Sequence, residues 1–123
     1  MYAFKTRWFN KWARKKGIGD DALKEALVRI QAGLGIVALG GELFKMRIGR
    51  EGGGRSGGYR TIVVYRESQK ALFIYGFEKS DRENIDVKTL DDYKKYARDF
   101  LGFQRQEMDR LVAAGALIPL EVL

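Results

Sequence analysis

Lys45 and Arg47 have the residue types and the spacing to bind phosphate from one side of a strand. They alternate with Phe44, Met46 and Ile48. Because successive side chains of a β-strand point to opposite faces, both cations should project from one face and the apolar side chains from the other. A register shift of one residue would bury both charges, so the alternation also fixes the orientation. The segment therefore predicts a cationic sheet face suited to a polyanion.

Further cationic and aromatic residues follow on the next two predicted strands and in their connections. These are Arg50, Arg55, Tyr59, Arg60, Tyr75, Phe77, Lys79 and Arg82. Cations hold phosphates and aromatic rings stack on unpaired bases, so together they predict a surface that binds RNA. Two other interpretations stay open. Lys45 and Arg47 could form an ordinary solvent-exposed face, and Tyr59 and Tyr75 could pack in the core or against neighbouring strands.

The composition limits the chemistry that this surface could perform. The sequence of 123 residues contains no cysteine and no histidine. Disulfides, thiolate zinc sites and cysteine nucleophiles are therefore excluded. Histidine is the usual general base near neutral pH, so many hydrolase mechanisms are excluded as well. We expect no metal and no cofactor, and we expect the chemistry to use Lys and Arg rather than histidine or a metal.

The charge of the chain is uneven. The formal net charge is +7, and residues 1–60 carry the cationic excess while residues 61–123 are close to balanced. A basic half beside a neutral half indicates a face for a polyanion, although a merely basic surface would look the same. The N-terminal residues lack the apolar core of a signal peptide, and no apolar run is long enough to span a membrane. We therefore expect a cytoplasmic protein.

The glycine-rich segment over residues 49–58 does not match a known phosphate-binding loop. No Gly-Lys-Ser/Thr follows it, which excludes a P-loop, and no strand-turn-helix context surrounds it, which excludes a dinucleotide fingerprint. It is either a mobile hairpin connection or a basic flap over a phosphate backbone.

Hydrophobic periodicity predicts the elements that must position these residues. We expect helices over 7–16, capped by Thr6, from Asp20 to before Gly33, from Thr89 to about 101, and over 104–114. Trp8 and Trp12 have helical spacing and are expected in the core. Strands are expected over 2–5, 43–48, 59–66 and 72–77, and Pro119 should stop the last helix.

The order of these elements predicts the fold class. Strands grouped beside helices indicate an α+β domain with a mostly antiparallel sheet. One sheet face should pack on the helices, and the other face or its edge should carry the cations. We expect a single domain over residues 1–123, with a C-terminal helical extension over about 88–123.

Three stretches resemble the RelE/HigB family of toxins from bacterial toxin–antitoxin modules, within the RelE/ParE superfamily. They are Leu39-Gly-Gly-Glu-Leu-Phe-Lys-Met-Arg-Ile-Gly-Arg50, Gly54-Arg-Ser-Gly-Gly-Tyr-Arg60 and Phe73-Ile-Tyr-Gly-Phe-Glu-Lys-Ser-Asp-Arg-Glu-Asn-Ile-Asp86. The resemblance implies a RelE-like fold with a small twisted sheet. It also implies metal-independent mRNA cleavage, usually in the ribosomal decoding site, and neutralisation by an antitoxin, often a helix-turn-helix DNA-binding protein. The basic strand pattern of the family falls on Lys45 and Arg47, its strand-entry arginine on Arg60, and its late basic or aromatic residues at or near Tyr75, Lys79 and Arg82.

These assignments lead to a mechanism in which the 2′-hydroxyl of RNA attacks the adjacent phosphorus. Lys45 is the candidate base, because neighbouring cations and partial burial favour its neutral form. Arg47 and Arg60 would hold the pentavalent phosphate, and Lys79 or Arg82 would assist the leaving group. Arg50, Arg55, Tyr59 and Tyr75 are the candidate RNA-binding residues. The alternatives are a non-catalytic nucleic-acid-binding module and a ParE-like toxin that acts on a topoisomerase.

Overall fold

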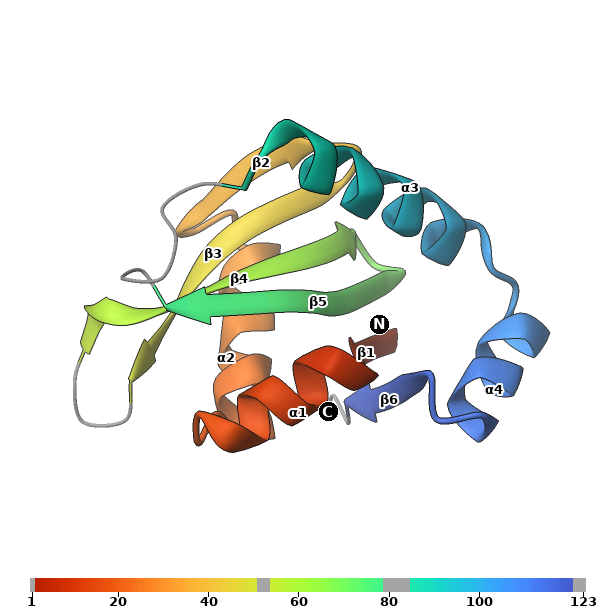
Figure 1. Ribbon diagram of the computed structural model, residues 1–123, viewed down its shortest axis with the longest axis horizontal. Helices are drawn as coiled ribbons and strands as arrows, with labels where there is room; N and C mark the ends of the chain where they lie inside the picture. The colour runs from red at the N-terminus through yellow and green to blue at the C-terminus, as the bar shows by residue number, and fades with distance from the viewer. Residues whose placement is uncertain (1, 51–53, 79–84, 121–123) are drawn as a thin grey trace.

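The computed structural model describes residues 2–50, 54–78 and 85–120. The elements follow the chain in the order β1 (Tyr2–Thr6), α1 (Arg7–Lys15), α2 (Asp20–Gln31), β2 (Ile36–Gly40), β3 (Leu43–Arg50), β4 (Gly54–Arg66), β5 (Lys70–Glu78), α3 (Val87–Gly102), α4 (Arg105–Ala113) and β6 (Leu117–Leu120). The described strands form one six-stranded sheet in the order β2-β3-β4-β5-β1-β6 (Figure 1). The predicted α+β class is confirmed. No helix of the described ranges is long and apolar enough to cross a membrane.

The sheet is mixed, because β1 lies parallel to β5 while the other neighbours run antiparallel. Strands β2 and β6 have no clear signal in the sequence and were not expected. β2 is short and follows Gly33 and Gly35, and β6 contains Pro119. An edge strand tolerates proline because one side of it needs no hydrogen-bond donors. The prediction that Pro119 stops the last helix is wrong. Helix α4 ends earlier, at Ala113, and Pro119 lies in β6.

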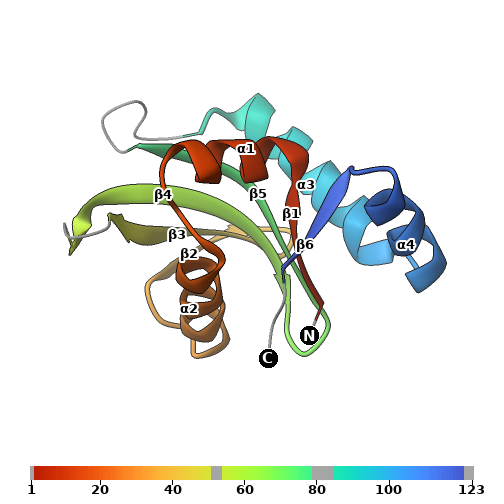
Figure 2. The same cartoon turned by 90° about the horizontal axis from the view of Figure 1, so that it is seen from below.

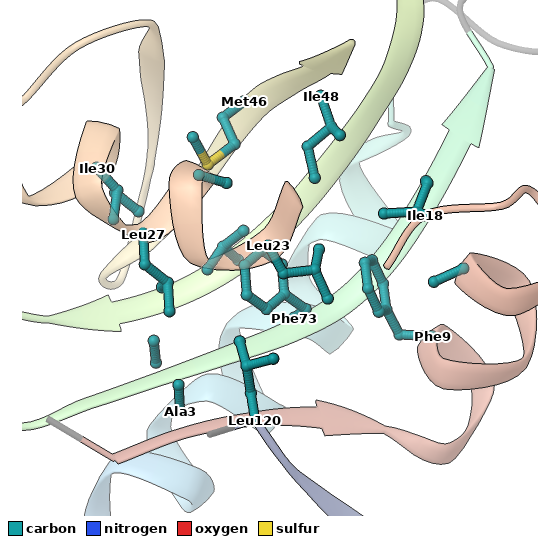
Figure 3. Close-up of a cluster of buried hydrophobic side chains, with 14 of the residues drawn as sticks. Ala3, Phe9, Ile18, Leu23, Leu27, Ile30, Met46, Ile48, Phe73 and Leu120 are labelled. Carbon is teal, nitrogen blue, oxygen red and sulfur yellow. The ribbon is translucent and has the colours of Figure 1, made fainter. Parts of the chain in front are cut away.

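Helices α1 and α2 pack against one face of the sheet. Thr6 begins α1 as predicted, since its Oγ1 accepts a hydrogen bond of 3.0 Å from the Phe9 amide. A single apolar cluster joins these helices to the sheet (Figure 3). It contains the fully buried side chains of Phe9 from α1, Leu23 from α2 and Phe73 from β5. This cluster, which also contains Met46 and Ile48, confirms the predicted inward face of β3.

Helices α3 and α4 pack against part of the opposite face, so both faces of the sheet carry helices (Figure 2). The sequence predicted helices on one face only, whereas α3 and α4 cover part of the second face, the one that also carries Lys45 and Arg47. Asp86, rather than the predicted Thr89, is the N-cap of α3, because its Oδ1 accepts a hydrogen bond of 2.8 Å from the Thr89 amide. At the other end, the Lys70 ammonium donates to the Phe100 and Phe103 carbonyls at 3.1 and 2.5 Å. Charged and polar side chains thus satisfy both ends of this helix.

The tight turn between β2 and β3 is held by an ion pair between Glu42 and Arg66. Glu42 has a left-handed backbone with φ of 63°, and the Arg66 Nε donates 2.8 Å to its Oε2. Arg66 Nη2 also donates to Oε1, so the pair is bidentate. The hydrogen bond from Arg66 holds the pKa of Glu42 below its ordinary value of 4.5.

This shift predicts the pH range in which the pair stabilises the fold. Because the folded pKa of Glu42 is lowered, its contribution is present above the unfolded value of 4.5 and is lost as pH falls through the folded value. Glu42→Gln should therefore cost up to about 1 kcal/mol at neutral pH and less in acid. Urea unfolding of both proteins across this range measures the difference. A constant difference at every pH would contradict the assignment.

A second prediction concerns the close contact between β5 and α1. A Cβ built on Gly76 would lie 2.1 Å from Trp12 Cζ3, and the Trp12 ring is itself held by Phe9 and Tyr59 at centroid distances of 5.5 Å. Gly76→Ala should therefore destabilise the fold by about 1–3 kcal/mol through overpacking. Gly102→Ala is the matched control, because a Cβ there meets nothing within 4 Å. Thermal unfolding should show a large loss for the first variant only.

Candidate nucleic-acid interface

The register of β3, β4 and β5 brings the main predicted cations onto one face. Arg47 is the Cα partner of Arg60, and Arg60 is the partner of Phe77. The adjacent row contains Lys45, Ile62 and Tyr75. Directly opposed residues have Cβ atoms about 5 Å apart and diagonal ones about 7–8 Å. Lys45, Arg47 and Arg60 therefore form a compact group, which we call the cation triad.

Arg60 is the unusual member of the cation triad because it is almost completely buried. Only 8% of the surface of Arg60 is exposed, and its Nη1 has no hydrogen-bond partner within the described residues. Burial, and then the nearby charge of Arg47, lower the pKa of Arg60. Within the described residues this buried nitrogen has no acceptor, and a phosphate oxygen would supply one.

Arg47 is exposed and Lys45 is half-buried, so these two cations can meet a ligand from solvent. Arg47 lies just beyond the end of the β2–β3 ladder, whose last pair joins Ile36 to Met46. Its carbonyl oxygen accepts a hydrogen bond of 3.0 Å from Nη1 of Arg29, a buried residue of α2. Arg29 also lies 3.0 Å from Glu25 through its Nε. Arg29 thus holds the unpaired edge of β3 at the residue that carries the exposed cation.

Tyr75 extends the cation triad with aromatic surface. Its ring stacks on Trp8 at 4.5 Å between centroids and lies 5.8 Å from Tyr93. The prediction that Trp8 is a core residue is wrong: Trp8 is 47% exposed, while Phe9 and Ala13 on the same helix are buried. Trp12 is partly buried, as its packing over Gly76 requires. The difference arises because α1 lies along β5 where β1 has ended, so one side of the helix faces solvent (Figure 1).

The remaining predicted site residues do not all join this group. Tyr59 lies on the opposite face, buried against Trp12, because it is adjacent to Arg60 and strand side chains alternate. Arg50 and Arg55 have their backbones in β3 and β4, and their side chains lie outside the described part. Lys79 and Arg82 also lie outside the described residues.

Sequence reasoning missed Trp8 and Arg29 as parts of this region. The exposure of Trp8 depends on where β1 ends relative to β5, and no local pattern reports that. Arg29 sits among the apolar positions Ala26, Leu27 and Ile30 of α2. A cation in that stripe is itself a signal, because a buried arginine is almost always paired with a polar group.

Comparison with family models gives a match over nearly the whole chain. A model described as "RelE toxin of RelE / RelB toxin-antitoxin system" matches residues 1–120. Searches of curated proteins and of solved structures gave no match.

The burial of Arg60 predicts an unusual effect on stability. Arg60→Met removes an uncompensated buried charge and keeps the apolar volume, so the variant should be more stable by about 1 kcal/mol or more. Arg47→Met is the matched control, and its exposed position should limit the change to about 0.5 kcal/mol. Chemical denaturation at low salt tests both. A clear loss of stability in Arg60→Met would show that the guanidinium is compensated.

Proposed function

The chain belongs to the RelE toxin family, and from this premise we propose that it is a metal-independent endoribonuclease that cleaves mRNA on the ribosome and so stops translation. Members of this family are typically ribonucleases, and the family is defined by a toxin–antitoxin pair. A cognate antitoxin of the RelB type is therefore the implied partner. The proposal adds the substrate, the reaction and the residues that perform it.

The observation that carries the proposal is the buried guanidinium of Arg60, whose Nη1 has no hydrogen-bond partner among the described residues. It lies opposite Arg47 and diagonal to Lys45 on the same face of the sheet. Holding three cations together raises the free energy of the folded protein unless an anion binds among them. A phosphodiester that gains negative charge in the transition state is stabilised more than one in the ground state, which is the requirement for catalysis.

The reaction that fits this surface is an internal transfer of the phosphate. The ribose 2′-oxygen forms a bond to the adjacent phosphorus, and the bond between phosphorus and the 5′-oxygen breaks. The products are a 2′,3′-cyclic phosphate and a new 5′-hydroxyl end. Arg60 and Arg47 would donate hydrogen bonds to the non-bridging oxygens while the phosphorus is pentavalent.

Two proton transfers complete this reaction. Lys45, on the same face, would accept the proton of the 2′-hydroxyl when its own amine is neutral. Lys79 or Arg82, which follow β5 in the sequence, would assist the departing 5′-oxygen. Arginine is a poor proton donor, so a large part of the rate must come from orienting the RNA. The ribosome would supply that orientation by holding mRNA in the decoding site, and this places the activity in the cytoplasm.

The antitoxin would act through the same electrostatics. We propose a partner that carries a helix-turn-helix DNA-binding domain and that blocks the cation triad from mRNA. Co-expression with the neighbouring small open reading frame should restore growth and give a complex. Failure to obtain rescue and complex together would count against this partner.

The catalytic proposal is tested by two substitutions in the cation triad. Induced Lys45→Ala and Arg60→Ala should each lose growth arrest, and mRNA cleavage should fall by about 100-fold or more, the usual cost of removing a transition-state donor or base. Transcript end-mapping after induction measures cleavage as new 5′ ends. Arg110→Ala, an exposed cation on α4, is the matched control and should remain toxic.

The outcomes separate the rival functions. If both triad variants cleave mRNA as the wild type does, the catalytic assignment is wrong. Growth arrest without new 5′ ends would indicate a non-catalytic nucleic-acid-binding protein. DNA damage signalling with intact transcripts would indicate a toxin that acts on a topoisomerase.

A further inference from the structure

A groove lies beside the cation triad, between α1, β5 and α3. Its volume is about 670 Å³, and its lining includes Trp8, Ile74, Tyr75, Asp92, Tyr93 and Tyr96. Trp8 on α1 forms one wall, Tyr93 and Tyr96 on α3 form the other, and Ile74 and Tyr75 of β5 lie between them. Four aromatic side chains therefore line one groove.

Two of these rings expose an unusual share of their surface. Trp8 is 47% and Tyr96 is 45% exposed, although both are large residues that usually lose most of their surface on folding. Trp8 is nevertheless fixed, because it stacks on Tyr75 with an interplanar angle of 22° and on Trp12 with one of 11°. A fixed ring that remains partly open to solvent, as Trp8 does, offers a planar ligand a surface with little loss of side-chain entropy.

Hydrogen bonds hold the frame of the groove in place. Thr6 Oγ1 donates 3.1 Å to the Ile74 carbonyl, which ties the start of α1 to β5. Arg7 donates through Nε to Gly115 and through Nη2 to Ala114, at 3.1 and 3.2 Å, which ties α1 to the turn before β6. Because its guanidinium is used in this way, Arg7 acts here as a link between elements.

The groove is continuous with the cation triad through Tyr75. Tyr75 and Arg60 are diagonal neighbours on the same sheet face, which places them about 7–8 Å apart. A phosphate on Arg60 would thus have an attached base within reach of Tyr75 and Trp8. Asp92 lines the groove itself, and its carboxylate disfavours a phosphate there. The charges therefore favour a neutral ring inside the groove and the anionic backbone on the cation triad.

We propose that this groove binds one unpaired nucleobase of the RNA strand whose phosphate lies on Arg60, with Trp8 and Tyr96 as the stacking walls. The assignment rests on the proposed function for the identity of the strand, and it adds a base-binding subsite that lies outside the cation triad. Stacking tolerates any base, so this subsite orients the strand for cleavage without selecting its sequence.

The test compares binding of two non-cleavable single strands that share one sugar–phosphate backbone. One strand is a short 2′-deoxy oligonucleotide with its bases, and the other is the matched strand without bases. The wild type should bind the first about tenfold more tightly, the expected contribution of one stacked base. Trp8→Leu, which keeps apolar packing against Tyr75, and Tyr96→Ala should each lose most of that preference while keeping affinity for the abasic strand.

Two controls make the result specific to the groove. Tyr2→Ala removes an aromatic residue that is 58% exposed and lies outside the groove, so it should retain the tenfold preference. Trp8→Leu should also leave the slope of affinity against salt concentration unchanged, because it removes no phosphate contact, whereas Arg60→Met should reduce that slope by about one.

Each outcome decides between the two proposals. Equal affinity of the wild type for both strands, or a full preference in Trp8→Leu, would overturn the base-binding groove even if mRNA cleavage stands. The expected loss of preference would support the groove even if Lys45→Ala still cleaves mRNA and the catalytic proposal fails. If Trp8→Leu weakens the antitoxin complex and leaves the base preference intact, the groove is a protein interface and the inference is wrong.

Discussion

The structure is organised around a buried cation, the guanidinium of Arg60. Arg60 lies in the middle strand of an antiparallel meander, opposite the charge of Arg47, and its Nη1 has no partner in the described part of the chain. Such a group costs free energy that must be recovered elsewhere. Apolar clusters on both faces of the sheet provide that stabilisation, one beneath α1 and α2 and the other beneath α3 and α4. The rigidity that binding requires therefore comes from packing around the cation rather than from contacts to it.

The parts that sequence reasoning predicted best are those with local signals. The alternation of Phe44, Lys45, Met46 and Arg47 correctly predicted the two faces of β3. In the observed register Arg60 lies opposite Arg47, on the face that also carries Lys45. The same parity rule separates Tyr59 from Arg60, which are neighbours in sequence and lie on opposite faces. The Thr6 cap of α1 and the apolar stripe of α2 were likewise predicted correctly, because caps and amphipathic periods act within a few residues.

What could not be predicted depends on contacts between distant segments. β6 forms by pairing with the free edge of β1, and the residues around Pro119 contain no local signal for that pairing. The exposure of Trp8 follows from the length of β1 relative to β5, and the burial of Arg29 follows from a carbonyl that β2 leaves unpaired. Each of these features belongs to the topology of the whole sheet. The aromatic groove is of the same kind, since its walls come from α1 and α3.

The position of β1 has a consequence for how the protein folds during its own synthesis. This strand precedes the other described strands in the chain, yet its two neighbours, β5 and β6, follow much later. Its backbone groups must therefore wait for residues 70–73 and then 117–120 before they pair, and contacts of such high sequence separation form slowly. The antiparallel strands β2 to β5 can pair first, because each is joined to the next by a local hairpin. The pairing of β6 with β1 comes after these hairpins, so the described sheet remains incomplete until β6 has left the ribosome.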